Sequence, residues 1–426
     1  MVAWRLARRH GARAWRCVSG EAQRLEEHWR LFSRCQTASA PVESLEALST
    51  ELHGLVQRTQ PTAEQEAAKD ALLRQVQQAG QESLDGCQAE LFGSAATKQW
   101  MPGSDLDICL LAPGMTAKAS QVRGLRKVAS ALRQLGGGTH NIQPRFHAQM
   151  PILRWAPRRP DRAGALACDI SVGNVLAVAN TRLIATYLEI DQRVPVLLRA
   201  IKVWAKKRGI NNRQRGSFSS FALTLMLIHV LQARPSPLLP SLQDLAIQHE
   251  LPPLFLQGAD CRYCSDSELI SGALLKLQGD HGTNQECVGA LLLEFFRYFG
   301  WVYQCGAIAI RDTSSFASKF EKSQSFYVVD NPFEPGKDVA NIEVRLFTRL
   351  REEFRRAHAL LCEGQPFDTL CEEPPQPGAD PLAGMISPGR NAPLTLRGTR
   401  AGKDAGQTAR SFRGVRAGVS GSANRI

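Results

Sequence analysis

Asp105 and Asp107 flank a single leucine and are the residues in this chain whose types and spacing most clearly suggest chemistry. In an extended strand, side chains two residues apart point the same way, so the two carboxylates share one face. Two carboxylates held that close repel each other unless a cation lies between them. A third carboxylate, Asp169 in a later apolar run, would complete a site for two Mg²⁺ ions from a neighbouring strand. The pattern predicts a phosphoryl-transfer site.

Gly93 and Ser94 close an apolar segment eleven residues before this acidic pair. Glycine lets backbone approach a phosphate closely, and a hydroxyl with free N–H groups can bind its oxygens. Together with Ser104, which precedes Asp105 directly, they predict a loop that meets the metal carboxylates at one triphosphate. The alternative is an acidic strand end that faces solvent.

The length of 426 residues predicts two domains, and the formal charge of +12 indicates an anionic partner, most commonly nucleic acid. Much of the excess charge lies in a Gly-, Ser- and Ala-rich tail, which we expect to be disordered over 366–426. Such a tail could equally add only unspecific affinity for phosphates. Eleven scattered cysteines favour free thiols over disulfides, and no apolar run is long enough to span a membrane.

The first twenty residues carry five arginines among apolar residues and no acidic residue. This composition is typical of a mitochondrial transit peptide over 1–20, which would place the protein in the mitochondrial matrix. The alternative is a basic arm that binds RNA.

Periodicity divides the rest of the chain into a mixed α/β unit and a mainly helical unit. We expect N-terminal helices over 21–60 that pack on the second domain, a catalytic domain over 61–175, and a helical domain over 176–365. In the first unit, Thr62 and Gln65 form a capping-box pattern, strands are expected at 88–92, 105–111, 145–155 and 166–172, and a helix at 121–135. In the second, helices are expected at 181–190, 195–208, 219–233, 267–277, 288–298 and 339–361, with a short strand pair near 306–311 and 325–329.

Six segments of the sequence resemble the nucleotidyltransferase core of the DNA-polymerase-β-like superfamily and, within it, terminal uridylyltransferases and their poly(A) polymerase relatives. They are Leu91-Phe92-Gly93-Ser94 with Asp105-Leu106-Asp107-Ile108, Leu166-Ala167-Cys168-Asp169-Ile170-Ser171-Val172-Gly173-Asn174, Asn180-Thr181-Arg182-Leu183, Lys202-Val203-Trp204-Ala205-Lys206, Gly216-Ser217-Phe218-Ser219-Ser220-Phe221 and Asp330-Asn331-Pro332-Phe333-Glu334. With the leader, the chain resembles mitochondrial terminal uridylyltransferases of trypanosomatids, particularly the compact type that associates with editosome-like complexes. The resemblance implies a polymerase-β-like domain with a mixed β-sheet and a mainly helical poly(A)-polymerase-associated domain, with the active site in the cleft between them.

The family's chemistry implies roles for the three aspartates. Asp105 and Asp107 would hold both Mg²⁺ ions, with Mn²⁺ as the alternative metal, and Asp169 would bind the catalytic ion and help to deprotonate the RNA 3′-hydroxyl. In-line attack on the α-phosphate of UTP would then expel pyrophosphate. The implied partners are UTP and the 3′ ends of single-stranded or double-stranded RNA, within a mitochondrial RNA-editing complex.

The implied UTP-binding residues are Gly93, Ser94, Ser104, Asn174, Lys202, Lys206, Ser220, Phe221, Asn331 and Glu334. Lys202 and Lys206 lie four apart on one helical face, where a triphosphate would relieve their repulsion, although Lys207 and Arg208 leave a solvated basic stripe as the alternative. Phe221 would stack on the base, or simply be core.

Asn174 would bind the ribose hydroxyls, and a helix N-cap is its alternative role. A carboxylate such as Glu334 near the base edge would favour uracil, whose N3–H is a donor, over adenine, whose N1 is an acceptor. Relatives commonly carry Asp at the position of Asn331, and an amide both donates and accepts, which weakens the argument for UTP. The segment could also be a turn that caps the last helix.

Three other functions remain open at this point. A poly(A) polymerase would share the whole architecture, a catalytically silent RNA-binding scaffold would keep only the fold, and a nucleotidyltransferase could instead act on small molecules. Retention of three aspartates, two lysines and the Gly-Ser pair favours an active enzyme.

Overall fold

The computed structural model describes residues 40–135, 140–158, 166–279, 282–304, 306–311 and 327–373. The expected transit peptide, the first part of the N-terminal helices expected over 21–60 and most of the expected tail lie outside these residues. None of the described helices is long and apolar enough to cross a membrane.

Five strands form one mixed sheet in the order β1-β2-β5-β4-β3. Their bounds are Gln88–Phe92 (β1), Leu106–Leu111 (β2), His140–Arg145 (β3), Ile152–Pro157 (β4) and Cys168–Val172 (β5). β2 and β5 are parallel, and the other neighbours are antiparallel. The mixed sheet predicted from the sequence is therefore confirmed.

The single strand expected at 145–155 is wrong, because the chain turns between β3 and β4. β3 was missed because its residues are mostly polar and include Pro144, which cannot donate to a ladder. A proline is tolerated here since β3 is an edge strand.

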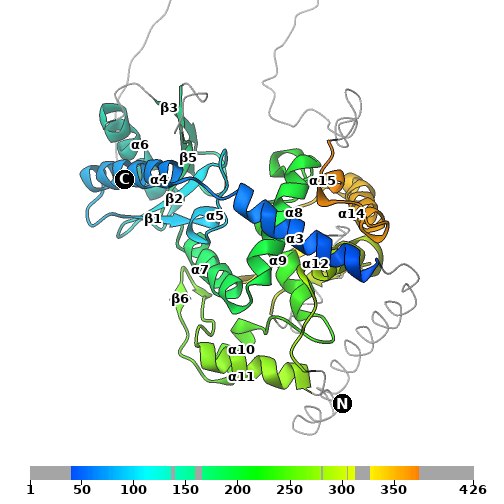
Figure 1. The fold of residues 1–426 in the computed structure, drawn as a ribbon. Coiled ribbons are helices and arrows are strands. Elements are labelled where there is room, and N and C mark those ends of the chain that lie inside the picture. The colour runs from blue at the N-terminus through cyan, green and yellow to red at the C-terminus, as the bar shows by residue number, and fades with distance from the viewer. Residues whose placement is uncertain are drawn as a thin grey trace, which may run out of the picture. The chain divides into compact units, whose positions relative to one another are not determined.

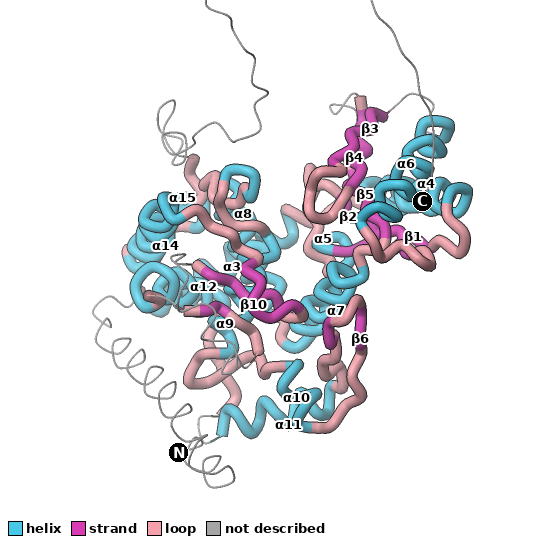
Figure 2. The backbone as a smooth tube through the Cα atoms, turned by 180° about the vertical axis from the view of Figure 1, so that it is seen from behind, coloured by secondary structure: helices cyan, strands magenta, loops and turns pink. Residues whose placement is uncertain are grey.

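Two helices, α4 (Ala63–Ser83) and α6 (Lys118–Leu135), pack against each other and against this sheet, as Figures 1 and 2 show. The capping box predicted at Thr62 is present, with its hydroxyl accepting from the Gln65 N–H. Buried residues of the helices and strands form a hydrophobic core of their own, including Val76, Leu125, Ile108 and Ile170.

A second core is built mainly from helices. They are α3 (Val42–Arg58), α7 (Val175–Ile190), α8 (Arg193–Lys207), α9 (Ser220–Gln232), α10 (Leu242–Gln248), α11 (Ser267–Gln278), α12 (Val288–Arg297), α14 (Phe347–Cys362) and α15 (Phe367–Leu370). Shorter elements are α5 (Gly93–Ala96), the 3₁₀ turns Arg213–Arg215 and Val344–Leu346, and the π-turn Tyr298–Val302. Three strands, β8 (Ala307–Ile308), β9 (Val328–Asn331) and β10 (Glu334–Asp338), form a small sheet, and β6 (Phe255–Leu256) pairs with β7 (Ala259–Asp260).

The helix α3 precedes the five-stranded sheet in sequence but contributes to the helical core. Leu48, Leu52 and Leu55 follow a helical repeat and are buried, and α3 packs on α8 and α12 (Figure 1). The chain between α3 and α4 therefore links the two cores.

Packed structure continues beyond residue 366, so the expectation of a disordered tail that begins there is wrong. Phe367 and Leu370 of α15 are buried in the helical core, and the Phe367 N–H donates to Glu51 of α3 at 2.8 Å. Residues 374–426 lie outside the described residues.

The fold predicts a loss of stability in mild acid at His358 on α14. Burial and the nearby Arg297 guanidinium lower the pKa of His358 from 6.5 to about 4. The unfolded chain takes up a proton near pH 6.5 and the native protein does not, so the free energy of unfolding falls as the pH drops from 6.5 to 4. We expect His358→Leu to remove on the order of 2 kcal/mol of that loss. Urea unfolding at pH 7 and pH 4.5 measures it.

The matched control is His53→Leu on the exposed surface of α3. An equal fall in stability for wild type and His358→Leu over this pH range would contradict the role assigned to His358.

Candidate functional site

The strand register brings two of the three aspartates side by side. Asp107 on β2 is the direct partner of Asp169 on the parallel strand β5, and Asp105 precedes β2 on the same side as Asp107. All three line one cavity of about 620 Å³. Chain segments more than sixty residues apart therefore converge on one acidic cluster.

Electrostatic repulsion within this cluster is strong. Burial is the main cause that raises the pKa of Asp107 to about 7, the Asp169 and Asp105 carboxylates contribute to the same rise, and the Lys202 ammonium opposes it. The pKa of Asp169 is also raised, by burial first, while the Arg154 guanidinium counteracts the rise. A bound cation would stabilise the ionised form of Asp107 beside the other two carboxylates, so the cluster favours cation binding.

Arg154 on β4 supplies the nearest positive charge. Its guanidinium donates to both Asp105 oxygens, at 2.5 and 2.8 Å, and to Asp169 Oδ1 at 3.4 Å. The register explains the contact, because Arg154 pairs with Asp169 across β4 and β5. The sequence predictions missed this residue, although the buried Leu153 and Trp155 on either side of it assign Arg154 to the opposite, charged face.

Carboxylate oxygens are the ligands that Mg²⁺ and Mn²⁺ prefer, so the donor chemistry of the three aspartates fits these metals. In the described part of the chain, however, no three acidic, histidine or cysteine side chains are grouped to hold a metal ion as they stand. Asp105 is instead engaged by Arg154. The ligand type of the three aspartates therefore suits these metals, while Asp105 and Asp169 are ion-paired with Arg154.

Gly93 is required where β1 meets α5. Its φ of +65° is left-handed, and a Cβ there would lie 2.7 Å from Asp107 Oδ2. Its N–H donates to Thr181 Oγ1 on α7 at 2.9 Å. The glycine thus admits the Asp107 carboxylate, and its N–H, which we expected to be free for a phosphate, is already bonded.

The predicted lysine pair lies on α8 and lines the same cavity. Lys202 is buried, and burial with the neighbouring Arg199 lowers its pKa to about 8 while Asp107 acts against the shift. Lys206 is exposed one turn later. A buried lysine beside a cluster of carboxylates presents a positive charge to whatever occupies the cavity.

Ser94, Ser104, Ser220 and Phe221 also line this cavity, as the family resemblance implied. Ser220 accepts from Asn211 Nδ2 at 3.0 Å. The Phe221 ring is half-buried, packing on the helical core on one side and bordering the cavity on the other. Both alternatives weighed for Phe221, core packing and stacking on a ligand, are compatible with this position.

Three of the expected UTP-binding residues do not line the cavity. Asn174 lies at the N-cap position of α7 and makes no capping hydrogen bond. Asn331 at the end of β9 and Glu334 at the start of β10 form the tip of a hairpin rather than a helix cap. The ribose role implied for Asn174 therefore has no support in the geometry.

Asn180 was not among the expected site residues and is better placed than Asn174. It lines the cavity, is buried, and its Nδ2 lies 3.4 Å from Asn331 Oδ1. Its Oδ1 has no hydrogen-bond partner among the described residues. The signal was available, because Asn180-Thr181 was part of the segment that carried the family resemblance.

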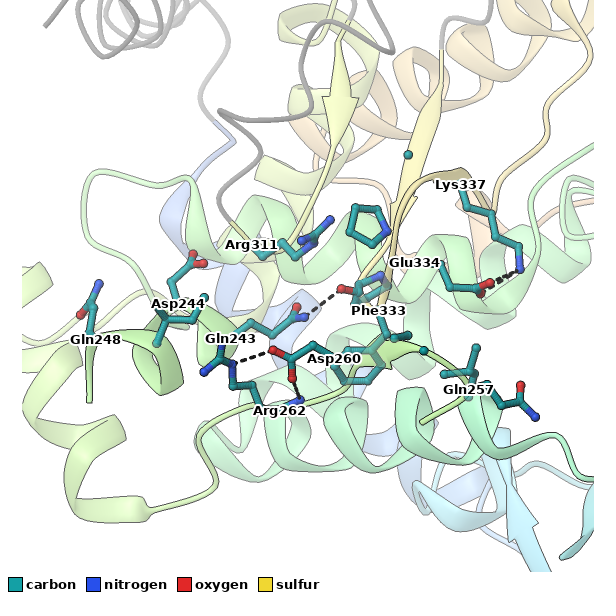
Figure 3. A pocket seen from close by; sticks show the side chains of 17 residues that line it. Gln243, Asp244, Gln248, Gln257, Asp260, Arg262, Arg311, Phe333, Glu334 and Lys337 are labelled. Carbon is teal, nitrogen blue, oxygen red and sulfur yellow. Dashed lines mark hydrogen bonds and ion pairs between the residues drawn. The ribbon is translucent and has the colours of Figure 1, made fainter. Parts of the chain in front are cut away.

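Glu334 faces a second cavity of about 890 Å³ beyond the hairpin. Figure 3 shows its carboxylate paired with Lys337, whose Nζ lies 2.8 Å from both oxygens. Asn331 Nδ2 donates to one of the same oxygens at 2.8 Å. Gln243 from α10 donates to the Pro332 carbonyl at 2.8 Å and helps to fix the hairpin (Figure 3). Both Glu334 oxygens thus already have donors within the protein.

Comparison with known proteins adds a family to this geometry. Residues 48–189 match a family described as poly(A) RNA polymerase, mitochondrial-like, central palm domain. This match covers the five-stranded sheet with α4 and α6 and most of α3 and α7, and includes all three aspartates.

Two curated relatives illustrate the sequence similarity. The chain is 30% identical over 318 residues to human terminal uridylyltransferase 7, covering 72% of this chain and 21% of the relative. It is 30% identical over 294 residues to the fission yeast (Schizosaccharomyces pombe) poly(A) RNA polymerase cid13, covering 66% of this chain and 47% of the relative. The chain thus spans about a fifth and just under half of these relatives.

Solved structures share the fold. A cytoplasmic RNA terminal U-transferase has a TM-score of 0.65 with 21% identity, over 78% of this chain and all of the other. Cid1 in complex with the UTP analogue UMPNPP has a TM-score of 0.61 with 20% identity, over 77% and 98% of the two chains. The polymerase-β-like fold with a helical second part, predicted from the sequence, is confirmed. The similarity to trypanosomatid enzymes in particular stays a prediction.

The repulsion at Asp107 leads to a prediction about stability. Because its native pKa is raised to about 7, the folded protein takes up a proton there before the unfolded chain does, so the cost of Asp107 is full above pH 7 and fades toward pH 4. We expect Asp107→Asn to raise the free energy of unfolding at pH 8, in the presence of a chelator, by about 2 kcal/mol. Urea unfolding at pH 8 and pH 4.5 measures the difference.

Asp70→Asn on the exposed face of α4 is the control and should change little at either pH. A lower stability of Asp107→Asn at pH 8 would show that repulsion within the acidic cluster is not a net cost.

Proposed function

Because the chain belongs to the poly(A)-polymerase-like nucleotidyltransferase family, which includes terminal uridylyltransferases, we propose that it transfers a nucleotide from a nucleoside triphosphate to the 3′ end of RNA. One observation carries the proposal: three carboxylates and two lysines line the same cavity. Carboxylates that hold divalent cations and cations that bind phosphates are the two requirements of phosphoryl transfer. The excess positive charge of the chain suits a nucleic-acid acceptor.

The roles follow from position. Asp105, Asp107 and Asp169 would hold Mg²⁺ or Mn²⁺, which neutralises charge on the triphosphate and on the attacking oxygen when bound. Lys202 and Lys206 bind phosphate oxygens, and Phe221 offers its ring to the base. Asp169 lies in register beside Asp107 and accepts the proton of the RNA 3′-hydroxyl. The oxygen so freed attacks the α-phosphate, and pyrophosphate leaves.

We further propose UTP as the nucleotide and template-independent addition of UMP as the reaction. Support comes from the similarity to human terminal uridylyltransferase 7 and from the position of Asn180, whose polar side chain is among the residues that line the cavity. ATP is the second candidate, for a specific reason: Glu334, expected to accept from uracil N3–H, has both oxygens engaged by Lys337 and Asn331. The palm domain is also of the mitochondrial poly(A) polymerase type.

The assay is extension of a 5′-labelled single-stranded RNA with Mg²⁺ and equal concentrations of UTP and ATP. We expect mainly uridine to be added, and we expect Asp169→Asn to reduce the rate at least about 10³-fold because a metal ligand and proton acceptor are lost. Predominant addition of adenosine would replace the uridylyltransferase assignment by poly(A) polymerase.

Two lysine variants serve as a matched pair in the same assay. Lys202→Met removes the buried charge at the cavity, and we expect it to raise KM for the nucleotide. Lys207→Met is the matched control, because it removes an exposed lysine next in sequence to the cavity residue Lys206.

Unchanged transfer by Asp169→Asn would refute catalysis at this site and favour a silent RNA-binding scaffold.

We also propose that the protein works in the mitochondrial matrix, within an RNA-editing complex. The arginine-rich composition of residues 1–20 is what supports it. Import of the labelled full chain into isolated mitochondria should depend on membrane potential and remove the leader. Import should be lost when residues 1–20 are deleted, and equal import of the two forms would refute the leader.

A further inference from the structure

Arg154 lies within the acidic cluster and is not used in the mechanism above. Its bidentate contact takes both oxygens of Asp105, and its reach to Asp169 makes it a bridge between two of the three expected metal ligands. Burial is moderate, since the side chains of Arg154, Asp105 and Asp169 are 24%, 41% and 22% exposed. The pair can therefore open without unpacking a core.

The sheet fixes where this guanidinium starts. Leu153 and Trp155 are buried on the opposite face of β4 and hold the strand in register, so Arg154 must project on the side of Asp169. A divalent cation between the carboxylates would lie close to the guanidinium and be repelled by it. The cation and the present position of Arg154 exclude each other.

We propose that Arg154 substitutes for the metal ions in the metal-free site and is displaced from Asp105 when a divalent cation binds. The inference rests on the proposed function only in taking the three aspartates as the metal ligands. By neutralising Asp105 and Asp169, Arg154 keeps the cluster together without metal. It also competes with the metal, so that Arg154 is a positioning residue that sets metal affinity.

This competition couples metal binding to nucleotide binding. A cation that binds without a nucleotide must displace the Arg154 guanidinium from Asp105, and the released guanidinium then gains no new anionic partner. A cation that arrives with a triphosphate brings anionic oxygens, which give the released guanidinium a new partner. The site therefore holds a bare cation weakly and a cation–nucleotide pair strongly.

The experiment measures Mn²⁺ binding to the full chain by electron paramagnetic resonance, without RNA and without turnover. We expect Arg154→Met to bind Mn²⁺ about threefold to tenfold more tightly than wild type, because a partly exposed ion pair no longer has to be broken. A non-hydrolysable UTP analogue should tighten Mn²⁺ binding more in wild type than in Arg154→Met. Without metal, Arg154→Met should melt at a lower temperature than wild type. Addition of Mn²⁺ should raise the melting temperature of Arg154→Met by more than that of wild type.

Arg182→Met is the matched control, because Arg182 pairs with Glu90 away from the cavity and should leave Mn²⁺ affinity unchanged. Arg154→Lys keeps the charge but loses the bidentate fork, so an intermediate affinity is expected. Equal or weaker Mn²⁺ binding by Arg154→Met overturns the inference. If that variant does not fold, equal or weaker binding by Arg154→Lys does so.

The same measurement separates this inference from the proposed function. Mn²⁺ binding that depends on Arg154, in a protein that transfers no nucleotide, would support the inference and refute the transfer. Absence of Mn²⁺ binding in every form would refute the metal site and the inference together.

Discussion

Repulsion among three carboxylates at one edge of the sheet is the constraint on which the rest of the site depends. The pairing of β2 with β5 places Asp107 and Asp169 side by side, and no rearrangement of side chains can separate them far. Arg154 on β4 of the sheet and Lys202 on α8 of the helical core each reduce the repulsion in part. What remains uncompensated at Asp107 favours the binding of a divalent cation.

The two hydrophobic cores divide the work at this site. The sheet core supplies the acidic residues on strands that cannot shift without losing ladder hydrogen bonds, and the helical core supplies the lysines and Phe221. The aspartates are held in fixed positions by the sheet, and the helical side of the cavity offers two basic side chains and an aromatic ring. This combination suits a ligand with a charged end and a flat end. A nucleoside triphosphate has both.

Local patterns predicted the parts of the site that depend on short-range spacing. The two-residue period of a strand was enough for Asp105 and Asp107, and the four-residue period of a helix for Lys202 and Lys206. Asn174, Asn331 and Glu334 do not line the cavity, since their places depend on how α7 and the β9–β10 hairpin dock, which no local period encodes. Arg154 escaped notice because a turn was not recognised before β4 and the pairing partner of that strand was unknown.

The hydrogen bond from Gly93 to Thr181 makes α7 a mechanical continuation of the catalytic sheet. Ala179, Leu183 and Tyr187 of the same helix are buried in the helical core, so α7 contacts both the sheet and that core along its length. A movement of the helical core relative to the sheet would have to break this hydrogen bond beside the acidic cluster. The spacing between Asp107 and Asp169 is therefore set by the paired strands β2 and β5, and α7 holds the helical core against the end of β1.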